Sequence, residues 1–180
     1  QMKSVGEVMA MGRTFQESLQ KAIRGLEIDR AGLESPLGKR PGEPYVQAEI
    51  DEIKAQARVP RAHRLFWIAE AFRAGLSVDE LFGLTWVDPW FLREIEEIVR
   101  TEATLANGVP QGAAAIRAAK VMGFSDKRIA QLAGTTEQAV RDARHAAGVR
   151  PVFKRVDTCA AEFEAFTPYL YSTYEEECEA

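Results

Sequence analysis

The sequence has few of the residues that form covalent cross-links or metal sites. Its 180 residues include only two cysteines, Cys159 and Cys178, and two histidines, His63 and His145. A chain of this length can bury a core without disulfides, so we expect both cysteines to be reduced thiols. Neither histidine has a Cys or His partner at the spacing of zinc ligands, and the sequence therefore predicts no metal site.

Signals for membranes and nucleotides are also lacking. No segment approaches the roughly 18 apolar residues of a membrane span, and residues 1–6 lack the apolar centre of a signal peptide. Acidic residues outnumber basic ones by 27 to 23, which argues against general attraction to nucleic acid or anionic lipid. Neither G-x-x-x-x-G-K-[ST] nor G-x-G-x-x-G occurs. We expect a cytoplasmic protein with no catalytic or cofactor-binding residue in this chain and no membrane or nucleic-acid partner.

Both ends of the chain have the character of internal sequence. The first residue is Gln1 rather than a methionine, and the last residues, 174–180, are acidic and contain no turn signal. We expect the chain to be part of a larger protein and to hold no complete active site.

Hydrophobic periodicity favours helices over most of the sequence. The helical segments are expected from Thr14, over 46–58, 61–74 and 77–84, from Asp88 to about 106, and over 111–122, 126–133 and 136–147. Thr14 with Glu17 and Ser77 with Glu80 have the spacing of capping boxes, and Asp88-Pro89 is a typical helix start. The fold class predicted is all-α: an orthogonal bundle of about six or seven helices with extended N- and C-terminal flanks.

Three segments do not follow this periodicity. Residues 5–13 alternate and predict a strand or an extended segment, and residues from Arg150 to Val156 are also expected to be extended. Residues 28–45 contain three glycines and three prolines, which indicates a loop and a domain boundary.

One segment, residues 125–147, suggests a DNA-binding alternative. Ala130, Gly134 and Val140 have the offsets of a helix-turn-helix corner. Seven basic residues against three acidic ones lie in the window 113–150, which gives a local charge of about +4. Glu137 and Asp142 oppose this alternative, because both carboxylates would be repelled by phosphates. Helix packing is therefore the favoured interpretation of this corner.

Tryptophans supply the candidate partner interface. Trp86 and Trp90 flank the helix start at Asp88, and Trp67 lies one predicted helix earlier. Tryptophan is enriched at interface hot spots, although in a helical domain it also commonly belongs to the core.

Longer motifs resemble one family. Residues 2–15 (MKSVGEVMAMGRTF) resemble the segment that closes an ATP-grasp half of the carbamoyl-phosphate synthetase large subunit. Residues 151–163 (PVFKRVDTCAAEF) and 169–180 (YLYSTYEEECEA) resemble its bridge into the second ATP-grasp half. Residues 68–78 and 90–97 are similar to its helical oligomerisation domain, whereas residues 28–60 match no part that we can place.

This resemblance implies a division into three parts: residues 1–27 close the first, carboxyphosphate-forming half, 28–150 form the oligomerisation domain, and 151–180 lead into the second half. The family makes carbamoyl phosphate from bicarbonate, glutamine-derived ammonia and two ATP, for arginine and pyrimidine biosynthesis. It uses ATP with Mg or Mn, and K. Its partners are a glutaminase small subunit and other large subunits. The family's catalytic motifs lie outside residues 1–180, so this stretch is expected to be an inactive spacer that contributes to association.

Overall fold

The computed structural model describes residues 7–160, 162–163 and 169–180. Within these residues the chain forms eight helices and one pair of strands. The helices are α1 (Phe15–Gly25), α2 (Gln47–Arg58), α3 (Arg64–Arg73), α4 (Val78–Thr85), α5 (Pro89–Leu105), α6 (Gly112–Val121), α7 (Asp126–Ala133) and α8 (Glu137–Ala146). The strands are β1 (Val152–Val156) and β2 (Tyr169–Thr173).

The all-α prediction is confirmed, but the expected number of six or seven helices is too low. Helix α1, which the sequence places in the N-terminal flank, packs against α5 and so belongs to the bundle. The strand alternative for residues 5–13 is wrong over 7–13, because no second strand of the described chain lies beside them. Residues 5 and 6 lie outside the described residues. The predicted loop at 28–45 and the extended segment after Arg150 are confirmed.

Local side-chain chemistry explains where the helices begin. Ser77 and Glu80 form the predicted reciprocal capping box at the start of α4. Asp88 accepts a hydrogen bond from the Trp90 amide at 2.8 Å, ahead of α5. At α1 only half of the predicted box forms: the Thr14 hydroxyl accepts from the Glu17 amide, but the Glu17 carboxylate accepts from the amide of residue 13 instead of residue 14.

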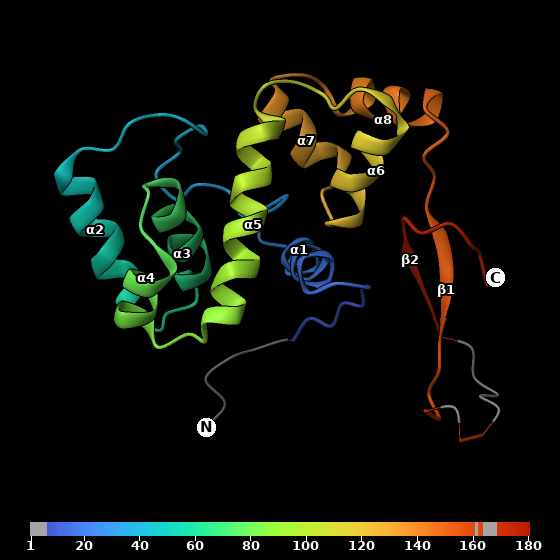
Figure 1. Cartoon of the computed structure of the whole chain (residues 1–180), viewed down its shortest axis with the longest axis horizontal. Coiled ribbons are helices and arrows are strands. Elements are labelled where there is room, and N and C mark those ends of the chain that lie inside the picture. The colour runs from blue at the N-terminus through green and yellow to red at the C-terminus, as the bar shows by residue number, and fades with distance from the viewer. Residues whose placement is uncertain (1–6, 161, 164–168) are drawn as a thin grey trace.

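Helix α5 is the central element of the bundle. Figure 1 shows α2, α3 and α4 on one side of it and α6, α7 and α8 on the other, with α1 beside its lower part. We call the first group the α2–α4 lobe and the second the α6–α8 lobe. The buried face of α5 presents Leu92, Ile95, Ile98, Val99, Glu102 and Leu105. One residue of this otherwise apolar face, Glu102, is charged.

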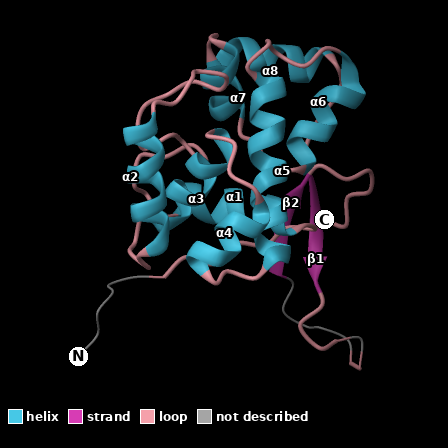
Figure 2. Ribbon diagram, turned by 60° about the vertical axis from the view of Figure 1, so that its left-hand side comes forward, coloured by secondary structure: helices cyan, strands magenta, loops and turns pink. Residues whose placement is uncertain are grey.

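The C-terminal flank is a β-hairpin attached to the helical body. Strands β1 and β2 pair antiparallel, with Val152 opposite Thr173 and Val156 opposite Tyr169. Figure 2 shows the hairpin beside α1 and below α6. The two flanks, which are distant in sequence, therefore lie on the same side of the molecule.

Candidate functional site

The N-terminal flank is fixed to the helical body by hydrogen bonds from α1 to the turn after α6. The buried Gln20 amide donates to the Met122 carbonyl at 2.9 Å, and the Arg24 guanidinium donates to the Gly123 carbonyl at 2.7 Å. Gly123 has φ +92°, and a Cβ atom there would lie 2.8 Å from the Cα of Glu17. Glycine at this position therefore allows the close approach of α1.

The C-terminal hairpin is fixed to the same lobe through Tyr174. Arg117 of α6 donates to the carbonyls of Tyr174 and Glu175 at 3.1 and 3.2 Å. The Tyr174 ring lies 5.0 Å from Lys120 Nζ and 5.8 Å from Arg144 Cζ, at cation–π distance from both. The side chain that enters the helical body is thus held by two cations.

The two flanks also contact each other directly. Arg13 pairs with Glu175 at 2.7 Å. Lys21 donates to the Ser172 carbonyl and lies 5.7 Å from the centre of the Tyr171 ring. We call this meeting point of α1, β2 and the α6–α8 lobe the flank junction. A cavity of about 260 Å³ lies within it.

A buried ion cluster of Lys120, Asp126 and Arg144 lies at the flank junction. Asp126 accepts from Lys120 Nζ at 2.8 Å and from Arg144 Nη2 at 2.8 Å. Burial alone would raise the pKa of Asp126, but hydrogen bonds and charge from Arg144 and Lys120 outweigh it and lower that pKa. Burial lowers the pKa of Lys120, and Asp126 offsets part of this effect. Because each charge has an opposite partner, the cluster can position Tyr174 but offers no free acid or base.

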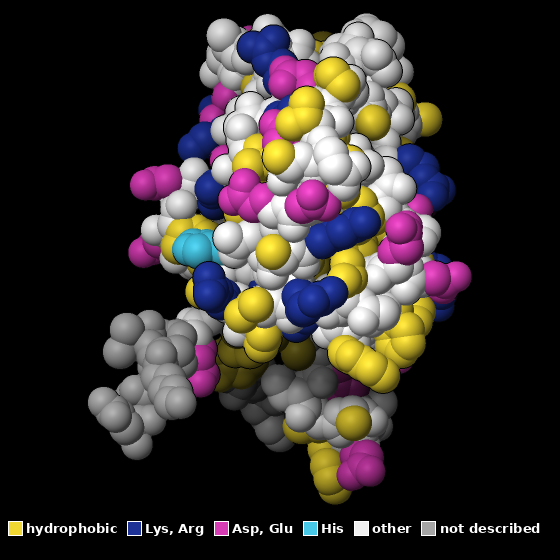
Figure 3. Space-filling model, turned by 90° about the vertical axis from the view of Figure 1, so that its left-hand side faces the viewer, with side chains coloured by type: hydrophobic (Ala, Val, Ile, Leu, Met, Phe, Trp, Pro, Cys, Tyr) yellow, Lys and Arg dark blue, Asp and Glu magenta, His cyan; other side chains and the backbone are white. Residues whose placement is uncertain are grey.

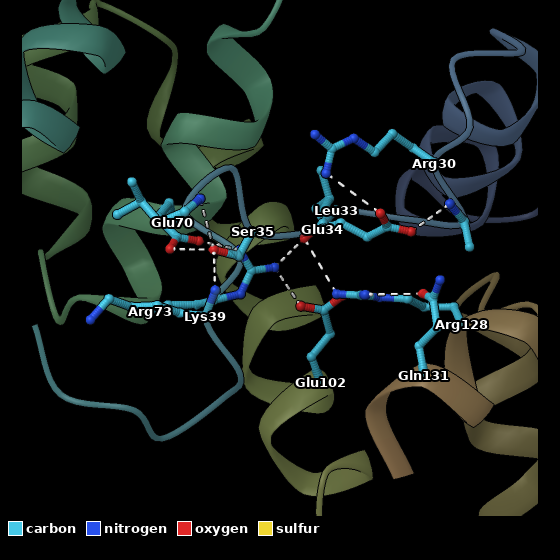
Figure 4. Close-up of polar contacts among 12 residues, drawn as sticks. Arg30, Leu33, Glu34, Ser35, Lys39, Glu70, Arg73, Glu102, Arg128 and Gln131 are labelled. Carbon is cyan, nitrogen blue, oxygen red and sulfur yellow. Dashed lines mark hydrogen bonds and ion pairs between the residues drawn. The ribbon is translucent and has the colours of Figure 1, made fainter. Parts of the chain in front are cut away.

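A second buried ion cluster joins the two lobes at the far end of α5, as Figure 4 shows. Glu102, which is fully buried, accepts from Arg73 of α3 at 2.6 Å and from Arg128 of α7 at 2.7 Å. Arg73 also pairs with the buried Glu70 at 2.8 Å. Burial acts to lower the pKa of Arg73, but the two carboxylates outweigh it and raise that pKa. We call these four residues the inter-lobe network.

The loop at 28–45 is anchored to the inter-lobe network. Ser35 Oγ and Tyr45 Oη both donate to Glu70 Oε1, at 2.6 and 2.9 Å. The Leu33 carbonyl accepts from Arg73 and Arg128. Burial and the neighbouring Glu70 raise the pKa of Tyr45, which keeps its hydroxyl protonated as a donor. The loop that contains most of the prolines and glycines of the first 60 residues is therefore held in place by charge.

Exposed aromatic rings form a surface at the α4–α5 connection. Trp86 is 81% exposed, Trp90 47%, Phe91 42% and Phe82 37%. The rings contact one another edge to face: Phe82 with Trp86 at 5.6 Å and Trp90 with Phe91 at 4.9 Å between centroids. We call these four residues the aromatic surface. In Figure 3 hydrophobic side chains gather along the lower edge of the helical body.

The predicted interface residues are placed in two different environments. Trp86 and Trp90 belong to the aromatic surface, whereas Trp67 is half-buried and packs against the hydrophobic core. His63 is the exposed N-cap residue of α3. Sequence reasoning missed Glu102, although its position four residues after Ile98 and three after Val99 places it on the buried face of α5. It also missed Tyr174, whose partners come from two distant helices, α6 and α8.

The helix-turn-helix corner is confirmed, with Ala130 and Val140 buried and Gly134 in the left-handed conformation at φ +67°. Most of the basic side chains that favoured DNA binding pair with groups of the chain itself. Among the seven basic residues of the window, those engaged in buried ion pairs are Lys120, Arg128 and Arg144. Arg117 binds the C-terminal flank, and Arg141 pairs with Glu137 of its own helix. The DNA-binding alternative therefore has no support in the structure.

The described residues bury ionisable side chains mainly as ion pairs. Among them no group of three or more His, Cys, Asp or Glu side chains could hold a metal ion. No helix in this part of the chain is long and apolar enough to cross a membrane. The buried carboxylates Glu70, Glu102 and Asp126 all face arginine. What the arrangement can do is hold segments together and present an apolar surface.

Comparison with known proteins gives a consistent result. Residues 7–148 match the family described as the oligomerisation domain of the carbamoyl-phosphate synthetase large chain. This range includes residues 28–60, which the motifs in the sequence did not place. The carbamoyl phosphate synthase large chain of Xanthomonas campestris pv. campestris is 54% identical over 182 residues, which cover all of this chain. Those of Xylella fastidiosa (Temecula1) and Myxococcus xanthus are 55% and 48% identical.

The chain spans 16% of the length of each of these relatives. The helical body, with its two attached flanks, is thus similar to one segment of a much longer protein. The chain belongs to the family of carbamoyl-phosphate synthetase large-chain oligomerisation domains.

Proposed function

We propose that this chain is the structural segment of a carbamoyl phosphate synthase large chain, which holds two catalytic halves in a fixed relation and contributes to subunit association. The observation that carries this proposal is the flank junction, where α1 and the segment 172–175 bind the same helical lobe and each other. If residues 1–27 close one ATP-grasp half and 151–180 lead into the other, the junction fixes where the first half ends relative to where the second begins.

The whole protein, in this proposal, makes carbamoyl phosphate from bicarbonate, glutamine-derived ammonia and two ATP. It serves arginine and pyrimidine biosynthesis in the cytoplasm and pairs with a glutaminase small subunit. ATP, its Mg or Mn ion, and K would bind outside residues 1–180. The isolated chain is catalytically inactive in this proposal, since the buried carboxylates Glu70, Glu102 and Asp126 are paired with arginine and Glu17 with Lys21.

Substitution at the flank junction of the full-length protein tests the spacer role. Tyr174→Ala removes the ring that lies against Lys120 and Arg144, so the two halves lose their fixed relation. We expect overall carbamoyl phosphate synthesis to fall several-fold more than the ATP hydrolysis of either half. Tyr169→Ala, at an exposed position of β2, the strand that precedes Tyr174, is the matched control and should leave both activities unchanged. Equal loss in synthesis and hydrolysis would contradict the spacer role.

Replacement of residues 28–150 by a flexible Gly/Ser linker of similar reach tests the association role. Sedimentation of the full-length protein over a concentration series should show the wild type as an oligomer and the replaced protein as a monomer. An oligomer that persists without residues 28–150 would contradict this part of the proposal.

A further inference from the structure

The aromatic surface leaves four large apolar side chains exposed to solvent, although they could be buried in a core. Two of its residues, Trp86 and Trp90, are rigid side chains of the type that dominates binding energy at interfaces. They flank the short α4–α5 connection, and each ring contacts a phenylalanine edge to face: Trp86 contacts Phe82, and Trp90 contacts Phe91. Exposed apolar rings gathered at one connection in this way mark interaction sites.

Trp86 has a backbone conformation that is unfavourable for a tryptophan. It is the C-cap of α4 with φ +57° and ψ +19°, the left-handed conformation in which Gly or Asn is preferred. A bulky side chain in this conformation is strained, and at 81% exposure it gains little burial in return. A residue that is unfavourable for both the backbone and the solvent points to a contact outside the described chain.

The size of the surface argues for a tethered partner. From their exposed fractions the four rings offer roughly 300–500 Å². A stable interface between separate molecules buries about 800 Å² on each partner. A partner joined to the chain by a short segment needs less area, because its effective concentration is in the millimolar range.

The N-terminal flank provides such a tether. Phe15, the first residue of α1, places its ring 5.4 Å from that of Trp90 and 5.3 Å from that of Phe91. The aromatic surface therefore continues directly to the point where residues 7–14 lead into the helical body. Residues 9 and 11 of this segment are methionines with exposed side chains, which extend the apolar character along the tether.

We propose that the aromatic surface is the docking site for another domain of the same polypeptide, which is joined through residues 7–14 and presents an apolar face to Trp86 and Trp90. This rests on the proposed function, in which the chain is one segment of a longer large chain. The surface is then an intramolecular contact, separate from whichever surface joins the subunits.

Photo-cross-linking in the full-length protein tests this assignment. Benzoylphenylalanine replaces Trp86, and a matched protein carries it in place of Arg141, which is exposed on α8. We expect position 86 to give adducts of monomer mass with residues outside 1–180, several-fold more than position 141. Adducts of dimer mass would assign the surface to a second copy and overturn the proposal. Absence of adducts above the control, or adducts confined to residues 1–180, would overturn it as well.

Limited proteolysis provides a second readout that does not depend on the photoprobe. Trp86→Asn, which leaves the contact of Trp90 with Phe15 in place, should accelerate cleavage within residues 7–14 of the full-length protein several-fold, since the docked domain no longer restrains the tether. Arg141→Ser is the control and should leave the rate unchanged. An unchanged rate in Trp86→Asn would also refute the docking. Loss of carbamoyl phosphate synthesis or of association in the sedimentation tests concerns the proposed function and does not alter either readout.

Discussion

Two regions at opposite ends of α5 reverse the usual distribution of side chains. Near its C-terminal end the inter-lobe network buries four charged side chains, Glu70, Arg73, Glu102 and Arg128. At its N-terminal end the aromatic surface exposes Trp86, Trp90 and Phe91 to solvent. Buried charge specifies the geometry where the lobes meet, and exposed apolar rings mark the surface for which a partner is proposed. The inter-lobe network thus holds the two lobes together, whereas the aromatic surface is available to other parts of the protein.

The largest expected effect is at the centre of the inter-lobe network. Glu102→Gln leaves Arg73 and Arg128 buried without their shared negative charge, which should reduce the free energy of unfolding by about 3–5 kcal/mol. Urea denaturation followed by circular dichroism measures this difference. Glu96→Gln on the same helix is the control, since its pair with the exposed Arg100 at 3.5 Å should contribute less than about 1 kcal/mol. Similar losses in both variants would mean that burial does not distinguish the two pairs.

The second effect concerns Asp126 and depends on pH. Its pKa is lowered in the folded chain, so it stabilises the fold above its unfolded pKa, and this contribution is lost as pH falls through the folded value. Asp126→Asn should therefore cost about 2–3 kcal/mol at pH 7 and progressively less below about pH 4. Thermal unfolding between pH 7 and pH 3 measures this convergence. Parallel pH profiles for the two proteins would contradict it.

A smaller effect is expected from Arg128→Lys, which keeps the charge but removes the planar guanidinium. Arg128 donates to Glu102 Oε1 from both Nε and Nη2, at 2.9 and 2.7 Å. An ammonium group cannot reproduce this fork, and we expect a loss of about 1–2 kcal/mol by urea denaturation. Arg141→Lys, at the exposed pair with Glu137, should change stability by no more than about 0.5 kcal/mol. A loss as large as that of Glu102→Gln would show that fork geometry matters as much as charge.

The smallest effect has the opposite sign. Trp86→Asn or Trp86→Gly relieves the left-handed backbone strain at the end of α4 and should stabilise the isolated chain by about 0.5–1 kcal/mol. Thermal unfolding of residues 1–180 measures the gain, with Trp67→Asn as a control that should lose stability because Trp67 packs on the core. A loss of stability in both Trp86 variants would mean that this ring stabilises the fold of the chain itself, which would contradict its assignment to a partner surface.

Prediction from sequence succeeded where the interaction was local. The boundaries of α7 were predicted to the residue, since Ser125 caps its start and Gly134 ends it. The paired Ser77 and Glu80 are likewise three residues apart, so their box could be found without knowledge of the fold. At α1 the same spacing misled in part, because the Glu17 carboxylate found a closer donor in the amide of Arg13.

Prediction failed where partners are distant in sequence. Arg128 and Glu102 are separated by 26 residues, and Arg117 and Tyr174 by 57. No spacing rule relates such pairs, because their meeting depends on how α5, α6 and α7 pack. The same limit explains why the basic window at 113–150 suggested a charged surface, whereas three of its basic side chains are buried.

The sequence by itself determined the helical class, most helix boundaries and the family to which the long motifs belong, because these depend on periodicity, caps and identity along the chain. Only the tertiary structure decided which charges are buried, that α1 is part of the bundle, and that the two flanks meet at one junction. It also decided that Trp67 packs inside while Trp86 and Trp90 face outward. Burial is a property of neighbours in space, and residues that share a surface or an ion pair here come from segments that the sequence does not relate.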